Sequence, residues 1–85
     1  MPEVIQQYAA QFRDEGGGTY AIVAYGEPVG GTWEGWLEFQ PLDRPGPSLR
    51  TGRETTQPDR AALEYWASGL EPLYFEGAFA RARPA

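Results

Sequence analysis

The stretch RETTQPDRAALEYW, residues 53–66, contains the junction between an expected strand and an expected helix, and this junction sets the fold class. It begins with charged and hydroxyl side chains and changes, at Pro58, into an amphipathic pattern. Thr56 stands three residues before Asp59, which resembles a capping box with aspartate in place of glutamate, and proline is tolerated in the first turn of a helix. We therefore expect a strand to end, and a helix to begin, near Gln57.

The far end of this helix is marked as well. Its apolar side chains recur at helical spacing and form one wide face: Ala62, Leu63, Tyr65, Trp66 and Ala67. Gly69 suits the left-handed conformation in which many helices end, and Pro72 follows soon after. The pattern predicts one helix at about 57–68.

Strand patterns precede this joint. TYAIVAYG, 19–26, is rich in β-branched and aromatic residues and predicts a central strand, buried on both faces. In TWEGWLEFQPL, 32–42, the side chains alternate, with Trp33, Gly35, Leu37 and Phe39 on one face and Glu34, Trp36, Glu38 and Gln40 on the other. After the turn-rich loop 43–48, LRTGRETT at 49–56 predicts a third strand, which completes a three-stranded antiparallel meander over about 19–56.

A register for this hairpin follows if Phe39 pairs with Leu49. The opposite pairs are then Glu38 with Arg50, Trp36 with Gly52, and Glu34 with Glu54. The first is an opposite-charge pair and the second lets an indole lie over a glycine, both favourable at roughly 0.2–1 kcal/mol. The third sets two carboxylates together, which is unfavourable unless an arginine or a partner lies between them.

The two ends of the chain complete the expected fold. In residues 3–13, Val4, Ile5, Tyr8 and Phe12 have helical spacing, whereas Tyr8, Ala10 and Phe12 alternate as in a strand, so this segment is either a helix or a strand. In LYFEGAFARA, 73–82, Leu73, Phe75, Gly77 and Phe79 alternate, which predicts a fourth strand at about 72–82 that rejoins the sheet. Residues 83–85 are a tail.

The expected fold class is α+β, in a single small domain that spans residues 1–85. One helix packs across one face of a small antiparallel sheet, with Leu63 and Trp66 against Leu37, Phe39 and Phe75. The N-terminal segment covers an edge or the second face. The order of the strands in the sheet stays open.

The composition excludes many chemistries. The chain has no Cys and no His, and its seven basic residues are all Arg. Disulfides, thiolate zinc sites, the usual general base and the amine of Schiff-base chemistry are therefore absent. We expect no catalytic residue, no cofactor and no metal, and hence no enzyme.

The formal net charge of −5 argues against nucleic acid as a partner, because phosphate binding needs clustered cations. No apolar run approaches the ~18 residues that a membrane helix needs, and the N-terminus has no signal-peptide pattern. We expect a soluble protein, cytoplasmic by default.

Three stretches carry a resemblance: TWEGWLEF at 32–39, LRTGRETTQPDR at 49–60 and LEYWASGLEPLYFEGAFARA at 63–82. Together they resemble a pattern found in small bacterial proteins of unknown function, over roughly residues 32–82. The resemblance implies a recurring bacterial single-domain fold. It implies no activity, substrate or cofactor.

One candidate ligand site lies at the strand-to-helix joint. Arg50 and Arg53 could hold an anion in a bidentate grip, and the helix N-terminus near Gln57 would add N–H groups. Glu54 and Asp59 could equally satisfy both arginines, which would make the joint a self-contained cap and ion-pair network. The second interpretation is favoured over the anion site.

The candidate interface is aromatic. Trp36 stands on the charged face of its strand, with Glu38 and Arg50, and we expect Tyr65 or Tyr74 near it. Exposed aromatics next to arginine are typical of interface anchors. The N-terminal segment or a second copy of the chain could instead cover the indole. The sequence favours a non-catalytic protein-interaction module, which either self-associates as a homodimer or serves as an accessory or regulatory subunit. The alternative is a binder of small anions or metabolites.

Overall fold

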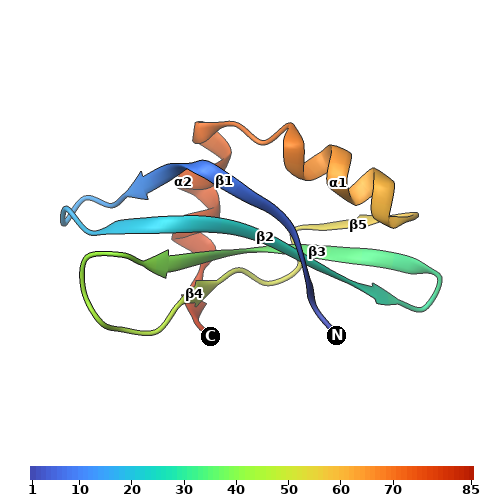
Figure 1. The fold of residues 1–85 in the computed structure, drawn as a ribbon, viewed down its shortest axis with the longest axis horizontal. Helices are drawn as coiled ribbons and strands as arrows, with labels where there is room; N and C mark the ends of the chain where they lie inside the picture. The colour runs from blue at the N-terminus through green and yellow to red at the C-terminus, as the bar shows by residue number, and fades with distance from the viewer.

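A long antiparallel meander forms the first half of the molecule in the computed structural model, which describes residues 1–85 (Figure 1). It consists of β1 (Glu3–Arg13), β2 (Thr19–Val29) and β3 (Thr32–Pro41). β2 lies between the other two and pairs with β3 without interruption from Tyr20↔Pro41 to Val29↔Thr32. The central strand and the strand that follows it are thus as predicted, although β2 continues three residues further into the hairpin, to Val29, and β3 ends one residue earlier, at Pro41.

β1 is a strand, and its irregular register explains why its sequence also fits a helix. The pairing with β2 shifts between Val4 and Gln6 and again between Gln7 and Gln11. Such bulges change which side chains share a face. As a result Ile5, Tyr8 and Phe12 all pack against the core, at spacings of three and four residues that imitate helical periodicity.

The third strand is split into β4 (Leu49–Arg50) and β5 (Thr55–Gln57). Phe39 pairs with Leu49 and Glu38 with Arg50, as predicted. The register then breaks, because β5 pairs with β3 two positions out of step and sets Thr56, not Glu54, opposite Glu34. The predicted pair of carboxylates was therefore wrong, and the sheet gives Trp36 no partner in β4 or β5.

Thr51 lies at the break and accounts for it. It is almost fully buried. Its N–H donates to the Leu37 carbonyl at 3.0 Å, and its hydroxyl accepts the Leu37 N–H at 3.1 Å. One residue thus satisfies both backbone groups of its neighbour in β3, which lets the residues after it leave the ladder.

The first helix, α1, spans Arg60–Ser68 and begins three residues later than predicted. Thr56 belongs to β5, so the predicted capping box does not form. Asp59 is the N-cap instead, and its carboxylate accepts the Ala62 N–H at 2.8 Å. The helix ends at Gly69 as predicted, but this glycine has φ −95° and is not left-handed.

The predicted fourth strand was wrong, because residues 72–81 form a second helix, α2 (Pro72–Arg81). Pro72 takes the first helical turn, where it is tolerated. Three alanines between residues 78 and 82 favour a helix, and the buried side chains Phe75, Ala78 and Ala82 recur at spacings of three and four. Leu73, which completed the apparent alternation, is 77% exposed.

The end of the chain is part of the sheet and not a tail. β6 (Arg83–Pro84) pairs antiparallel with β4, and the Ala85 N–H donates to the Ser48 carbonyl at 2.9 Å. The sheet order is β1-β2-β3-β4-β6, with β5 as a second partner of β3. β1 therefore forms one edge of the sheet.

Both helices cover the same face of the sheet, and α2 crosses the strands (Figure 1). The core between them and the sheet has nine buried members: Tyr20, Ile22, Ala24, Leu37, Phe39, Ala67, Phe75, Ala78 and Ala82. Fully buried Leu63 of α1 lies over Gly26 and Gly35, where a Cβ at either glycine would clash with it. Neither helix is long and apolar enough to cross a membrane.

Candidate interaction site

β1 is an edge strand with few of the features that usually protect an edge. Only its first and last residues, Glu3 and Arg13, are charged, and residues 4–12 contain no proline, lysine or other charged residue. An edge strand carries a row of backbone N–H and C=O groups without a strand partner. Its two register shifts are one of the protections that natural edge strands commonly carry.

A groove of about 940 Å³ runs beside this edge, between β1 and α2. Every residue from Tyr8 to Gly16 lines it. Successive side chains of a strand point to opposite faces, so a groove that touches all of them lies along the rim of the strand and not on one face of the sheet. The other wall consists of Leu70, Pro72, Phe75, Glu76, Phe79 and Ala80.

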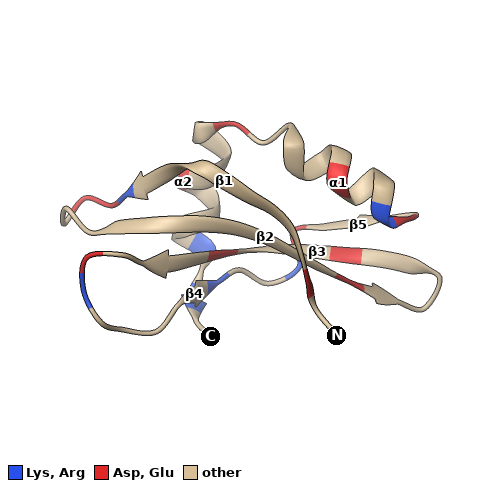
Figure 2. Ribbon diagram, in the orientation of Figure 1, with Lys and Arg blue, Asp and Glu red and all other residues tan.

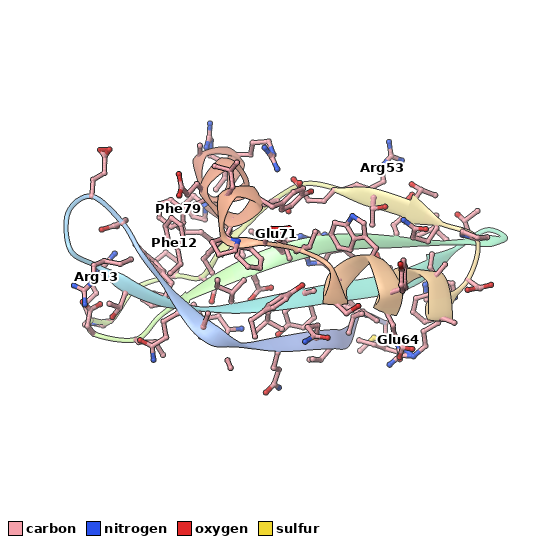
Figure 3. The ribbon with its side chains drawn as sticks, turned by 90° about the horizontal axis from the view of Figure 1, so that it is seen from above. Phe12, Arg13, Arg53, Glu64, Glu71 and Phe79 are labelled. Atoms are coloured by element: carbon pink, nitrogen blue, oxygen red, sulfur yellow. The ribbon has the colours of Figure 1, made fainter.

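Aromatic rings form the floor of the groove. Phe12 and Phe79 lie side by side between β1 and α2 (Figure 3), with their ring centroids 4.6 Å apart. Tyr8 meets Phe75 edge to face at 4.9 Å. The Tyr8 hydroxyl donates to the Ala67 carbonyl at 2.7 Å, which fixes the ring, and its burial raises the pKa of the phenol to about 12. The floor is thus apolar, rigid and neutral.

Acidic residues line both walls of the groove. Asp14, Glu15 and Glu76 line it together with a single arginine, Arg13. Acidic segments follow β1 and precede α2 (Figure 2). The Asp14 carboxylate is already used within the chain, since it accepts the Gly18 N–H at 2.8 Å and the Tyr20 hydroxyl at 3.3 Å. The formal charge of the lining is −2, on an apolar floor.

The predicted aromatic anchor, Trp36, is not exposed. It lies on the sheet face opposite the helices but is only 3% exposed. The Arg50 guanidinium lies over its indole at 4.1 Å, and Tyr25 stacks beside it at 6.2 Å. Gln40 donates to Glu38 at 3.3 Å in the same layer. Side chains from β2, β3 and β4 thus surround the tryptophan within one copy of the chain, so no second copy is needed to bury it.

Tyr65 and Tyr74 do not lie near Trp36 as predicted, because they belong to the helical layer. Tyr65 is on the outer side of α1 and is 83% exposed. Tyr74 is half-buried in α2 and meets Trp66 edge to face at 6.1 Å. The sheet therefore separates the residues that the sequence placed together.

Glu54 is the most extensively hydrogen-bonded member of the predicted polar cluster. It accepts the Tyr74 hydroxyl at 2.5 Å and two bonds from Arg81, at 2.6 and 3.1 Å. Burial alone would raise the pKa of the Glu54 carboxyl, but the hydrogen bonds from Arg81 and Tyr74 and the charge of Arg81 outweigh it and lower the pKa. Burial and the bond to Glu54 raise the pKa of Tyr74 to about 12. This triad fastens α2 to the strand segment before β5.

The predicted anion site does not assemble at the joint. Arg53 pairs with Glu34 at 3.5 Å, and Arg50 lies on the indole of Trp36. The side chain of Thr55 lies beside Gly35, on the face of the sheet that the helices cover. Gln57 follows two residues later in β5 and therefore points to the same face, where the Gln57 amide donates to the Thr55 hydroxyl at 2.7 Å. The arginines and the glutamine therefore lie on opposite faces of the sheet.

The glycine-rich loops act as turns. Gly17 and Gly30, at the two hairpin tips, have φ of +86° and +61°, which favours glycine. A Cβ at Gly18 would meet the guanidinium of Arg44, which donates to the Tyr20 hydroxyl. The first hairpin is thereby fastened to the loop that follows β3. A smaller cavity of about 360 Å³ between these loops is lined by Asp14, Gly16, Gly17, Gly18, Asp43 and Arg44.

Sequence reasoning missed the groove. Its two walls come from residues 8–16 and 70–80, which are distant in sequence, and one wall was assigned to a strand. One local signal for the groove is visible in the sequence. Residues 3–13, which precede the segment DEGGG, carry no internal charge, and this is unusual for a strand at the edge of a sheet. Comparisons with protein-family models, with curated proteins and with solved structures each found no match to this chain.

Proposed function

We propose that this protein is a non-catalytic interaction module that binds a protein partner along β1. The observation that supports the proposal best is the coincidence of two features: a long edge strand without internal charges and an apolar groove of about 940 Å³ along the same rim. Apolar grooves with a few polar groups at the rim are typical of binding sites.

An edge of this kind can bind by strand addition. A partner strand that lies beside β1 forms main-chain hydrogen bonds with its free edge, and every second side chain of the partner enters the groove. The rings of Phe12 and Phe79 offer a preformed apolar surface to those side chains. The module would act as an accessory or regulatory subunit, by holding another chain.

The ionisable groups at the groove favour binding over chemistry. Tyr8 has a pKa of about 12 and stays protonated at neutral pH, so it is a poor general base. Asp14 is held by the backbone of its own hairpin. Glu15, Glu76 and Arg13 remain, and they suit recognition of charge at the rim.

The test is affinity capture from cells in which the protein occurs naturally, with one lysine placed on either wall of the groove. Ala10→Lys adds a charge to the edge of β1, and Ala80→Lys adds one to the exposed side of α2. Val29→Lys is the matched control, because Val29 is 43% exposed at the far hairpin and does not line the groove.

We expect the wild type and the control variant to capture the same protein, and both groove variants to lose it. A second, differently tagged copy in the same cells shows whether the captured protein is the chain itself. Capture that survives both groove variants, or that Val29→Lys abolishes equally, would contradict the proposal. All variants need circular dichroism spectra and melting temperatures close to wild type.

A further inference from the structure

We infer that the occupant of the groove is an extended segment of another protein, with alternating apolar residues and basic residues at its ends. The inference rests on the proposed function and specifies its partner. Three observations carry it: the edge position of β1, the shape of the groove and the sign of the charges around it.

The first observation selects an extended segment over a helix. The groove follows β1 from Tyr8 to Arg13 and continues along the turn residues 14–16, so a strand that runs beside the edge would lie along it. A helix in this place would have its own backbone bonds satisfied and would leave those of the edge without partners. A strand satisfies both chains at once.

The second observation sets the side chains of the partner. One face of an added strand points to the helical layer, where Phe75 and Phe79 of α2 and Leu70 from the loop before it form the wall. Because a strand has a period of two, only alternate residues of the partner can enter the groove. These must be apolar, since the rings of the floor offer them no hydrogen-bond partner.

The third observation sets the charge. Asp14, Glu15 and Glu76 against Arg13 make the lining acidic, and the whole chain has a formal charge of −5. A second copy would bring another −5 and an edge strand with no excess of positive charge. Complementary charges steer association and disfavour partners of like sign. A basic segment of a different protein therefore fits better than self-association.

The experiment measures the binding of short labelled peptides to the purified protein by fluorescence anisotropy. The main probe has alternating valine and threonine with lysines at both ends. Three other peptides vary one property each: glutamates replace the lysines, alternate amides of the main probe are N-methylated, or the sequence is that of β1 itself, EVIQQYAAQFR.

We expect the lysine-flanked peptide to bind at least about tenfold more tightly than the glutamate-flanked one, since several rim pairs each contribute modestly. This preference should shrink as salt is raised. The N-methylated peptide should not bind, because it cannot form the main-chain bonds along one edge. Chemical-shift changes in NMR spectra should fall on residues 8–16 and on α2.

Charge reversal in the protein provides the matched control. Glu15→Lys with Glu76→Lys should invert the preference, so that the glutamate-flanked peptide binds better. Glu27→Lys with Glu64→Lys changes the net charge equally but away from the groove, and it should leave the lysine-flanked peptide preferred.

Each contrary result has a definite meaning. If the peptide of β1 binds more tightly than the basic probe, the partner is a second copy, and the inference is overturned while the interaction module stands. Equal binding of both flanked peptides would overturn the inferred charge preference. Unchanged binding after N-methylation would overturn binding by strand addition. If no peptide binds at millimolar concentration, the inference about the partner is overturned. The proposed interaction module is then tested separately, by the affinity capture described above.

Discussion

Glu54 offers the sharpest test of the polar contacts that hold the fold together, since its carboxylate accepts hydrogen bonds from two side chains of α2. Its side chain is 8% exposed, while that of Arg81 is 52% exposed. A hydrogen bond to a charged group contributes about 1.5–3 kcal/mol, whereas a solvent-exposed ion pair contributes about 0.2–1 kcal/mol. The bond from Tyr74 should therefore outweigh the pair with Arg81.

We expect Glu54→Ala to lower the free energy of unfolding by about 2–3 kcal/mol, because it removes the Tyr74 bond and the Arg81 pair together. For a domain of this size that is roughly 8–24 °C in melting temperature. Double-mutant cycles with Tyr74→Phe and Arg81→Gln, measured by urea denaturation, separate the two couplings.

The coupling of Glu54 with Tyr74 should be about 1.5–2 kcal/mol, and that with Arg81 about 0.5–1 kcal/mol. The reference is the pair of Arg53 and Glu34, with its arginine 62% exposed and a distance of 3.5 Å, for which we expect less than about 0.5 kcal/mol. A Tyr74 coupling no larger than this reference would refute the claim that Glu54 fastens α2.

The pH dependence of stability follows from the lowered pKa of Glu54. A carboxyl whose pKa is lower in the folded state stabilises the fold above its unfolded pKa, near 4.5, and loses this effect as the pH falls through the lower, folded value. The stability difference between the wild type and Glu54→Gln should thus be constant from neutral pH to about 4.5 and shrink below it. A difference that grows on acidification would contradict the reasoning.

Three further predictions concern the helix start, the core and the phenols. Asp59→Ala should lower the free energy of unfolding, measured by urea denaturation, by about 0.5–2 kcal/mol, whereas Thr56→Ala should change it little. Equal losses would indicate that Thr56 caps the helix after all. Gly26→Ala should cost about 1–3 kcal/mol, since a Cβ there clashes with the leucine of α1; an unchanged melting temperature would contradict this contact. Absorbance titration should show Tyr8 and Tyr74 ionising near pH 12. Because their pKa is raised on folding, their contribution to stability is present below pH 10 and lost between pH 10 and 12, and ionisation of these two phenols near pH 10 would refute this.

The parts of the fold that sequence patterns predicted correctly are those set by local alternation. β2 and β3 pair along their whole length, so the period of two is unbroken in both. The pairs of Phe39 with Leu49 and Glu38 with Arg50 follow from the same regularity. The prediction failed where Thr51 uses its hydroxyl in place of a backbone group, because side-chain bonds to a neighbouring strand leave no periodic signal.

α2 was misassigned because residues spaced by four satisfy both periods. Phe75 and Phe79 share a face in a strand as well as in a helix, so they could not decide between them. The alanines and the position of Pro72 carried the distinguishing information, and intrinsic helix propensity should have outweighed a short alternation. β1 shows the converse case, in which bulges made a strand resemble a helix.

The candidate site was harder to predict than the fold. The burial of Trp36 depends on the stacking of Arg50 from another strand, which no local pattern shows. The groove exists only because α2 stands beside β1, so a wrong assignment for α2 removed it from view. Only the absence of charge in residues 4–12 was visible in advance.

The most direct test of binding at the β1 edge is amide hydrogen exchange, measured on the free protein and on the complex recovered by affinity capture. If the partner adds a strand beside β1, amides in residues 3–16 and along the exposed side of α2 should become protected, while those of β4 and β5 stay unchanged. Protection confined to β4, β5 or the face that carries Trp36, with β1 exchanging as in the free protein, would contradict binding at this edge.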